Sequence, residues 1–180
     1  MKNIIEVDKS KTICFSGPRP IKYEYSGKKL EKINFILYSE ITGLLRAGFN
    51  TLIFGGAPGF DLISLKAALR IKEETEYKNI QLICALPYEK FSESQHFDDY
   101  WLRWYNEIIP HCKIINVGKS IEAFPGCFRK RNYFMVDNSA ALICLYNGQP
   151  GGTGQTYLYA VRKKLQIINI YKRVEKADEE

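Results

Sequence analysis

Two glycine-rich segments could hold an anionic ligand through their backbones. They read GGAPGFD (55–61) and NGQPGGTGQT (147–156), and each runs into a predicted helix. Glycine has no side chain, so its backbone N–H can approach a ligand closely, and a helix N-terminus attracts negative charge. The arrangement therefore favours phosphate binding. Glycines are also common turn residues between a strand and a helix, and neither segment is a P-loop or a GxGxxG motif.

The candidate ligand-binding residues lie in five segments that follow predicted strands or begin predicted helices. They are Ser16, Gly17, Arg19, Gly55, Gly56, Ala57, Gly59, Asp61, Pro87, Arg129, Arg131, Asn132, Gly151, Gly152, Thr153, Gly154, Gln155 and Thr156. Arg19 stands between two prolines as the main charged group of its loop, which suits contact with a ligand or a carboxylate. A plain surface arginine is the alternative.

Three of the candidate charged residues have a second interpretation. Asp61 begins a predicted helix, where aspartate often serves as a cap. Arg129 and Arg131 lie near the start of another helix, where positive charge is unfavourable unless another interaction compensates it. Without such an interaction, the two arginines would form a solvated face.

The glycine-rich segments need a sheet to bring them together. Short apolar runs predict strands at 12–16, 51–55, 80–86, 113–117, 141–146 and 166–171, and helices are predicted at about 28–47, 60–75, 97–109, 128–138 and 154–165. This alternation predicts an α/β fold with a mostly parallel sheet covered by helices. Loops that follow parallel strands share one edge of the sheet, where such folds bind ligands. In the helix at 97–109, Trp101, Trp104 and Tyr105 recur at the spacing of a packing face, with an aromatic wall against a base as the alternative.

Composition fits one cytoplasmic domain. The chain has 180 residues, 46% of them hydrophobic, and a formal net charge of +6. We expect a single domain over 1–172 and a charged C-terminal tail over 173–180. No run of about 18 apolar residues predicts a membrane span. The five cysteines lack paired spacing and read as reduced, mostly buried thiols, and neither histidine has a metal-ligand partner at a suitable spacing, so no metal site is expected.

Four motifs in this order resemble the SLOG superfamily, and within it the YpsA-like group of single-domain proteins. They are FSGPRP, GGAPGFDLISLKAAL, FRKRNYFMVDNSAALICLY and GQPGGTGQTYLYA, and the resemblance covers about 12–171. It implies a Rossmann-like three-layer sandwich whose glycine loops hold a nucleotide or a nucleotide-derived ligand. Relatives include DNA-processing protein A, which binds single-stranded DNA, phosphoribohydrolases of the Lonely Guy type, and sensor domains for ADP-ribose-like signals. One departure is the long segment that separates Pro87 and Tyr88 from Gln95 and Trp101.

Three functions follow from the residues and the resemblance. The leading hypothesis is a binding protein that senses or sequesters an ADP-ribose-like or similar nucleotide-derived small molecule. Single-stranded nucleic-acid binding is an alternative, motivated by Arg129, Lys130 and Arg131. The third is a nucleotide N-glycosidic hydrolase. Lonely Guy enzymes carry PGGxGTxxE, but here Leu158 stands where the catalytic glutamate should be. We therefore expect no catalytic residue and no cofactor. A second copy of the same chain, in a homo-oligomer, is a further candidate partner.

Overall fold

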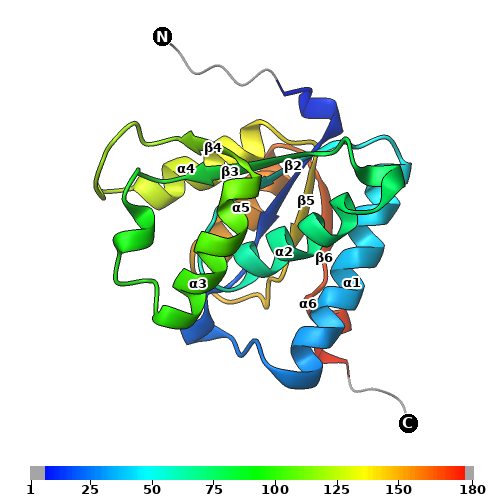
Figure 1. Cartoon of the computed structure of the whole chain (residues 1–180), viewed down its shortest axis with the longest axis horizontal. Helices are drawn as coiled ribbons and strands as arrows, with labels where there is room; N and C mark the ends of the chain where they lie inside the picture. Colours follow the sequence, from blue (N-terminus) through cyan, green and yellow to red (C-terminus); the bar gives the residue numbers. More distant parts are fainter. Residues whose placement is uncertain (1–6, 177–180) are drawn as a thin grey trace.

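The computed structural model describes residues 7–176 and confirms the α/β fold (Figure 1). The expectations for residues 1–6 and 177–180 lie outside the described residues. Six strands form one sheet, and every pairing in it is parallel. The strands are β1 (Thr12–Ser16), β2 (Thr51–Phe54), β3 (Gln81–Leu86), β4 (Lys113–Asn116), β5 (Ala141–Cys144) and β6 (Gln166–Asn169).

The sheet order places β1 at a topological switch point. Its order is β4-β3-β2-β1-β5-β6, so the chain builds outward from β1 on one side and then crosses to β5 on the other. Cys14 of β1 pairs with Ile53 of β2 and with Leu142 of β5. The connections after β1 and β5 therefore leave the sheet in opposite directions, which opens a crevice at its carboxyl edge.

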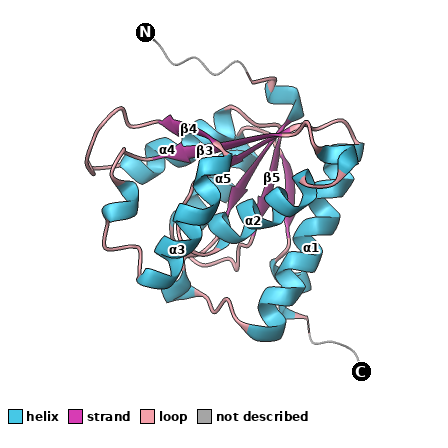
Figure 2. Cartoon of the chain, in the orientation of Figure 1, coloured by secondary structure: helices cyan, strands magenta, loops and turns pink. Residues whose placement is uncertain are grey.

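Helices cover both faces of the sheet (Figure 2). Ile13 and Phe15 of β1 pack into the layer that contains α1, α2, α3 and α6, whereas Cys14 packs into the layer that contains α4 and α5. The helices are α1 (Gly27–Arg46), α2 (Phe60–Lys72), α3 (Asp99–Ile108), α4 (Cys127–Asp137), α5 (Gly152–Arg162) and α6 (Tyr171–Glu175). This is the expected three-layer Rossmann-like sandwich.

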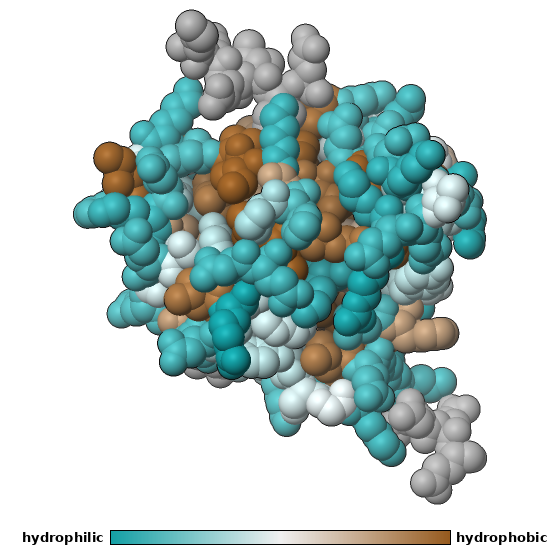
Figure 3. Space-filling view, viewed as in Figure 1, coloured by the Kyte–Doolittle hydropathy of each residue, from teal (hydrophilic) through white to brown (hydrophobic). Residues whose placement is uncertain are grey.

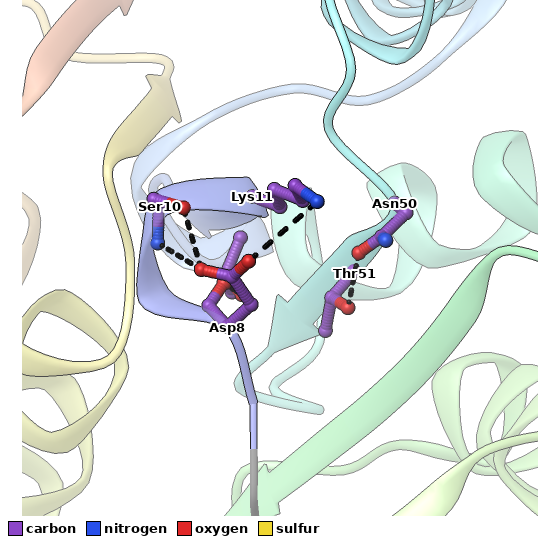
Figure 4. Close-up of polar contacts among 6 residues, drawn as sticks. Asp8, Ser10, Lys11, Asn50 and Thr51 are labelled. Atoms are coloured by element: carbon purple, nitrogen blue, oxygen red, sulfur yellow. Dashed lines mark hydrogen bonds and ion pairs between the residues drawn. The ribbon is translucent and has the colours of Figure 1, made fainter.

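Short 3-10 helices occupy several connections, namely η1 (Lys9–Lys11), η2 (Pro20–Lys22), η3 (Thr75–Tyr77), η4 (Phe91–Glu93) and η5 (Ile109–His111). At the amino edge of the sheet, a local polar network precedes the first two strands (Figure 4). Asp8 accepts a hydrogen bond from the Ser10 N–H at 3.0 Å, and Asn50 accepts one from the Thr51 hydroxyl at 2.9 Å. These contacts fix the start of the strands at the edge opposite the crevice.

The C-terminal segment differs from the sequence expectation. The strand predicted to end at residue 171 ends at Asn169, and α6 follows it. Val174 of α6 is buried in the core, and Glu175 accepts a hydrogen bond from the Tyr23 hydroxyl. Residues 173–175 of the predicted tail are therefore held against α1 and the loop that leads into it, since Arg173 also pairs with Glu40 of α1.

Hydrophilic residues cover most of the face shown in Figure 3, with apolar residues exposed between them. None of the helices between residues 7 and 176 is both long and apolar enough to cross a membrane. All five cysteines are free thiols, and four of them are buried, as predicted. Within the same residues, no group of three His, Cys, Asp or Glu side chains could hold a metal ion.

Candidate ligand-binding cleft

A cleft of about 630 Å³ lies at the carboxyl edge of the sheet, between the loops that follow β1 and β5. Ligand sites of small molecules and cofactors have volumes of about 300 to 1,000 Å³. The position is the switch point of the sheet order, where open α/β folds bind ligands. The cleft is therefore the candidate site.

The structure brings eleven of the sequence-predicted site residues together around this cleft. They are Ser16, Gly17, Arg19, Ala57, Asp61, Arg131, Asn132, Gly151, Gly152, Thr153 and Gly154. The other seven do not line it: Gly55, Gly56, Gly59, Pro87, Arg129, Gln155 and Thr156. Both glycine-rich segments thus contribute, but the second contributes a continuous stretch of backbone and the first mainly Ala57 and Asp61.

Two glycines of the first segment serve the packing of the loop. A Cβ atom on Gly56 would lie 2.8 Å from the Cys84 sulfur. Gly59 has a φ of +89°, and a Cβ atom there would lie 2.7 Å from the carbonyl oxygen of Pro18. A side chain at Gly59 would be strained as well as crowded. Gly59 thus allows the loop after β2 to pack directly against the loop after β1, which positions both around the cleft.

A buried ion pair lines the inner wall of the cleft. Arg131 Nη1 lies 3.8 Å from Asp61 Oδ2, and the exposed fractions of the two residues are 4% and 8%. Arg131 also donates to the carbonyl oxygen of Gly55 and, through Nε, to Asn132 Oδ1 at 2.7 Å. A Cβ atom on Gly55 would overlap both charged groups. Gly55 is therefore needed to admit the pair, although it lies outside the cleft itself.

Burial shifts both partners of this pair toward their neutral forms. Loss of hydration raises the pKa of the Asp61 carboxyl, and the charge of Arg131 and the hydrogen bond from the Ala57 N–H oppose that rise. Loss of hydration lowers the pKa of Arg131, and Asp61 opposes that change. Asp61 has neither a free carboxylate nor the role of a helix cap, since Gly59 is the N-cap residue of α2.

Arg19 crosses the cleft on the side of the loop after β1. Its Nη1 donates to His96 Nδ1 at 2.9 Å, and its guanidinium lies 4.7 Å from the centre of the Phe128 ring. A guanidinium over an aromatic face is stabilised by the ring quadrupole. The two contacts hold the Arg19 guanidinium in place at the wall of the cleft.

The first turn of α5 forms another part of the cleft wall. Gly151 is the N-cap residue, and the Gln155 N–H donates to its carbonyl oxygen at 2.9 Å. The N–H groups of the first helical residues, 152–154, have no partner within a helix. These groups carry the positive end of the helix dipole, and their residues line the cleft. Lys22 adds a positive charge nearby, since a Cβ atom on Gly151 would lie 3.5 Å from its Nζ.

An asparagine on β6 holds the loop that leads into α5. Asn169 Oδ1 accepts from the Tyr146 N–H at 3.0 Å, and Asn169 Nδ2 donates to the Tyr146 carbonyl oxygen at 2.9 Å. These two hydrogen bonds fix the backbone of Tyr146, which lies beyond the end of β5 and lines the cleft. A Cβ atom on Gly154 would approach the Tyr146 ring at 3.1 Å, so helix and loop also pack closely there.

Sequence reasoning missed most of the outer wall of the cleft and anticipated only Trp101, as one alternative. This wall is built from Gln95, His96, Phe97, Asp98 and Trp101, which precede or begin α3. Trp101 is buried, as the packing prediction requires, and also lines the cleft. The departure of the 87–101 segment from the YpsA-like pattern was the available signal, because an altered loop at the carboxyl edge of a parallel sheet alters the site.

Leu158, in the position of the Lonely Guy glutamate, lies outside the cleft. Its exposed fraction is 57%, and it does not line the site. Five charged residues do line the cleft, namely Arg19, Lys22, Arg131, Asp61 and Asp98. Asp98 Oδ1 accepts from the Trp101 N–H at 2.9 Å and so caps α3. With Asp61 paired to Arg131, the remaining charge of the wall is positive.

Comparisons with known proteins agree with this architecture. UPF0398 proteins of Bacillus thuringiensis (strain Al Hakam) and Bacillus cereus (strain AH820) are each 22% identical to the chain over 165 residues, which covers 89% of this chain and 88% of the relative. DNA processing protein A from Streptococcus pneumoniae has a similar structure, with a TM-score of 0.60 and 14% identity over 88% of this chain and 50% of that one.

DNA processing protein A from Helicobacter pylori, whose structure concerns a single-stranded DNA binding mode, matches with a TM-score of 0.54 and 20% identity over 89% of this chain and 65% of that one. These two similarities show a shared fold, and the chain spans half the length of the first protein. The model of the YspA SLOG family (YpsA) matches residues 14–174. The resemblance predicted from the motifs is thereby confirmed, and the chain belongs to the YspA SLOG family.

Proposed function

We propose that the chain binds a nucleotide-derived small molecule in this cleft, with an anionic phosphate group at the amino end of α5. The observation that carries the proposal is the continuous stretch Gly151–Gly154, which lines the same cleft as Arg19. A helix N-terminus with little side-chain bulk is a ready anion site, and a fixed arginine adds charge-assisted hydrogen bonds.

The apolar part of the same cleft supports a nucleoside as the rest of the ligand. Phe97, Trp101, Phe128 and Tyr146 line it beside polar groups such as Gln95 and Asn132. Ligand sites typically combine apolar and aromatic walls with a few polar groups that fix orientation. ADP-ribose, cyclic ADP-ribose, NAD and AMP all combine a base with phosphate, and ADP-ribose-like molecules are the class that we favour. The protein then acts as a sensor or a sink for that molecule.

The experiment is mass spectrometry of small molecules released from the purified protein, followed by calorimetry with those four compounds. Arg19→Gln should weaken the affinity by about 1.5 to 3 kcal/mol, the worth of a hydrogen bond to a charged group. Arg129→Gln is the matched control, because Arg129 is exposed and does not line the cleft. Equal losses in both variants would point to general electrostatics, and the absence of binding by any of the four compounds would refute the proposal.

Single-stranded nucleic acid is a second candidate. Arg129 and Lys130 are exposed in the first turn of α4, which also carries the cleft residues Phe128 and Arg131. Such a basic strip could follow a phosphate backbone, with bases stacking on the aromatic wall. An oligonucleotide would then bind with an affinity that falls steeply with salt, and Arg129→Gln would reduce the slope of that dependence. Lack of binding at low salt would exclude this candidate.

A further inference from the structure

The contact between Arg19 and His96 fixes the protonation state of the imidazole. Arg19 Nη1 and His96 Nδ1 are 2.9 Å apart. A guanidinium can only donate, so Nδ1 must accept, and the ring must be neutral with its hydrogen on Nε2. Burial and the charge of Arg19 also lower the pKa of His96. In the structure, therefore, one N–H group of Arg19 donates to a neutral histidine ring.

Aromatic rings hold this histidine at the wall of the cleft. The His96 ring contacts Phe128 edge-on, with ring centres 5.4 Å apart, and also lies near Phe91 at 6.5 Å. Phe128 at the same time supports the Arg19 guanidinium. Both polar groups line the cleft. The pair is therefore positioned as a unit, and neither partner has to move far to meet a ligand.

The charges around His96 favour a change of state when an anion arrives. Arg19 is the charged group that faces the His96 ring from the loop after β1. Two acidic residues, Glu93 and Asp98, lie in the segment that carries His96, and two basic residues, Arg129 and Arg131, lie on α4. Asp61 and Arg131 bear on Arg19 in turn. With Asp61 compensating Arg131, Arg19 dominates near the imidazole and opposes its protonation. A bound phosphate would offset that charge and favour the protonated ring.

We propose that His96 is an anion-binding residue of the cleft that takes up a proton when the ligand binds. The phosphate replaces Nδ1 as the acceptor for Arg19, and the Nδ1 atom, now protonated, donates to the phosphate. The site then presents two cations, Arg19 and His96, to one anion. This inference rests on the proposed function and identifies the phosphate group as the part of the ligand that Arg19 and His96 recognise.

The sign of the pH dependence follows from this exchange. The free protein holds His96 neutral at pH 7, and the complex raises the pKa of the ring. The ligand affinity therefore rises as the pH falls through the pKa that His96 has in the complex. It levels off below the pKa that His96 has in the free protein. We expect the dissociation constant of AMP or ADP-ribose to fall by about tenfold between pH 8 and pH 6 in the wild-type protein.

The matched variant is His96→Asn. The asparagine carbonyl oxygen can still accept from Arg19 as Nδ1 does, but it cannot take up a proton. This variant should lack the tenfold gain in affinity that the wild type shows between pH 8 and pH 6. AMP changes its own phosphate charge near pH 6. The change is common to both proteins, so the difference between them isolates His96.

Two readouts decide the matter. Calorimetry in buffers of different ionisation enthalpy at pH 6.5 measures proton uptake, which we expect in the wild type and not in His96→Asn. Proton NMR follows the ring directly, because His111 is the only other histidine and lies before β4, at the opposite edge of the sheet. AMP, ADP-ribose or pyrophosphate should raise the pKa of His96.

The outcomes separate this inference from the proposed function. Nucleotide binding without proton uptake, and with an unchanged His96 titration, would overturn the role of His96 and leave the binding proposal intact. An unchanged titration combined with no binding of these three probes, of cyclic ADP-ribose or of NAD would overturn both. Proton uptake in the wild type that persists in His96→Asn would assign it to a different group and would also overturn the inference.

Discussion

Replacing Gly152 with aspartate should separate folding from ligand binding. Gly152 is the first residue of α5, and a Cβ atom there would meet no other atom within 4 Å. Its φ is not among the positive values, so the substitution causes no strain. The new carboxylate would stand at the positive end of the helix dipole, where it stabilises the helix, and also at the wall proposed to hold phosphate.

The substitution should stabilise the fold but weaken ligand binding. Removing a glycine from a helix and adding an acid to its first turn should raise the free energy of unfolding by about 0.5 to 2 kcal/mol. A carboxylate about 5 Å from a phosphate charge repels it by about 1.7 to 3.3 kcal/mol at an effective dielectric constant of about 20 to 40. Ligand affinity should therefore fall by at least about tenfold.

The assay combines urea unfolding of the free protein with calorimetry of the ligand that the wild type binds. Gln155→Glu is the control, because residue 155 lies in the same turn of α5 but is exposed and does not line the cleft. It should stabilise the helix and leave affinity within about twofold of wild type. A Gly152→Asp protein that is folded, more stable and binds the ligand as tightly as the wild type would refute the phosphate position.

Three further predictions concern the packing of the cleft and its chemistry. Gly59→Ala should destabilise the protein by about 1 to 3 kcal/mol, because residue 59 has a positive φ and no room beside Pro18. The control Gly43→Ala, in the open interior of α1, should raise stability by about 0.5 to 1 kcal/mol. Equal effects of the two substitutions in urea unfolding would contradict this prediction. Arg131→Met should cost about 3 to 5 kcal/mol near pH 7 by leaving the Asp61 carboxylate buried and unpaired. Since burial raises the pKa of Asp61, that cost should shrink as the pH falls and the carboxyl becomes neutral, and a cost that grows toward acid would oppose this account. Incubation of the protein with AMP should give no free adenine detectable by chromatography, because Leu158 replaces the Lonely Guy glutamate and lies outside the cleft. Multiple turnovers that are lost in Asp61→Asn would show that the protein is an enzyme and would contradict this prediction.

Much of the fold could be predicted because its signals are local. The apolar runs place β1 at 12–16 as the structure does, and all six predicted strands end within two residues of the observed ends. The sixth was extended to 171 because IINIY reads as a strand, but Asn169 turns its side chain back to the backbone of Tyr146 and ends it. That contact spans 23 residues, and no local pattern reports it.

The cleft could be predicted only in part, for the same reason. Glycines after strands are visible in the sequence, so the stretch 151–154 was identified. Whether a given glycine meets the ligand or the core depends on neighbours from other strands, as the approach of Gly56 to Cys84 shows. Arg131 reads as a surface residue or a ligand contact until Asp61, 70 positions earlier, is placed beside it. His96 carries no motif and becomes informative only beside Arg19.

An amide chemical-shift map of the wild-type protein, titrated with ADP-ribose and in parallel with AMP, tests whether the phosphate binds at the amino end of α5. We expect the largest changes at the N–H groups of Gly152, Thr153 and Gly154, with smaller changes at Gly17 and Arg19. Hydrogen bonds to phosphate should move the α5 amides downfield, because their donors gain a charged acceptor. Saturable shifts confined to Arg129 and Lys130 on α4, with the amides of 152–154 unmoved, would contradict this position of the phosphate.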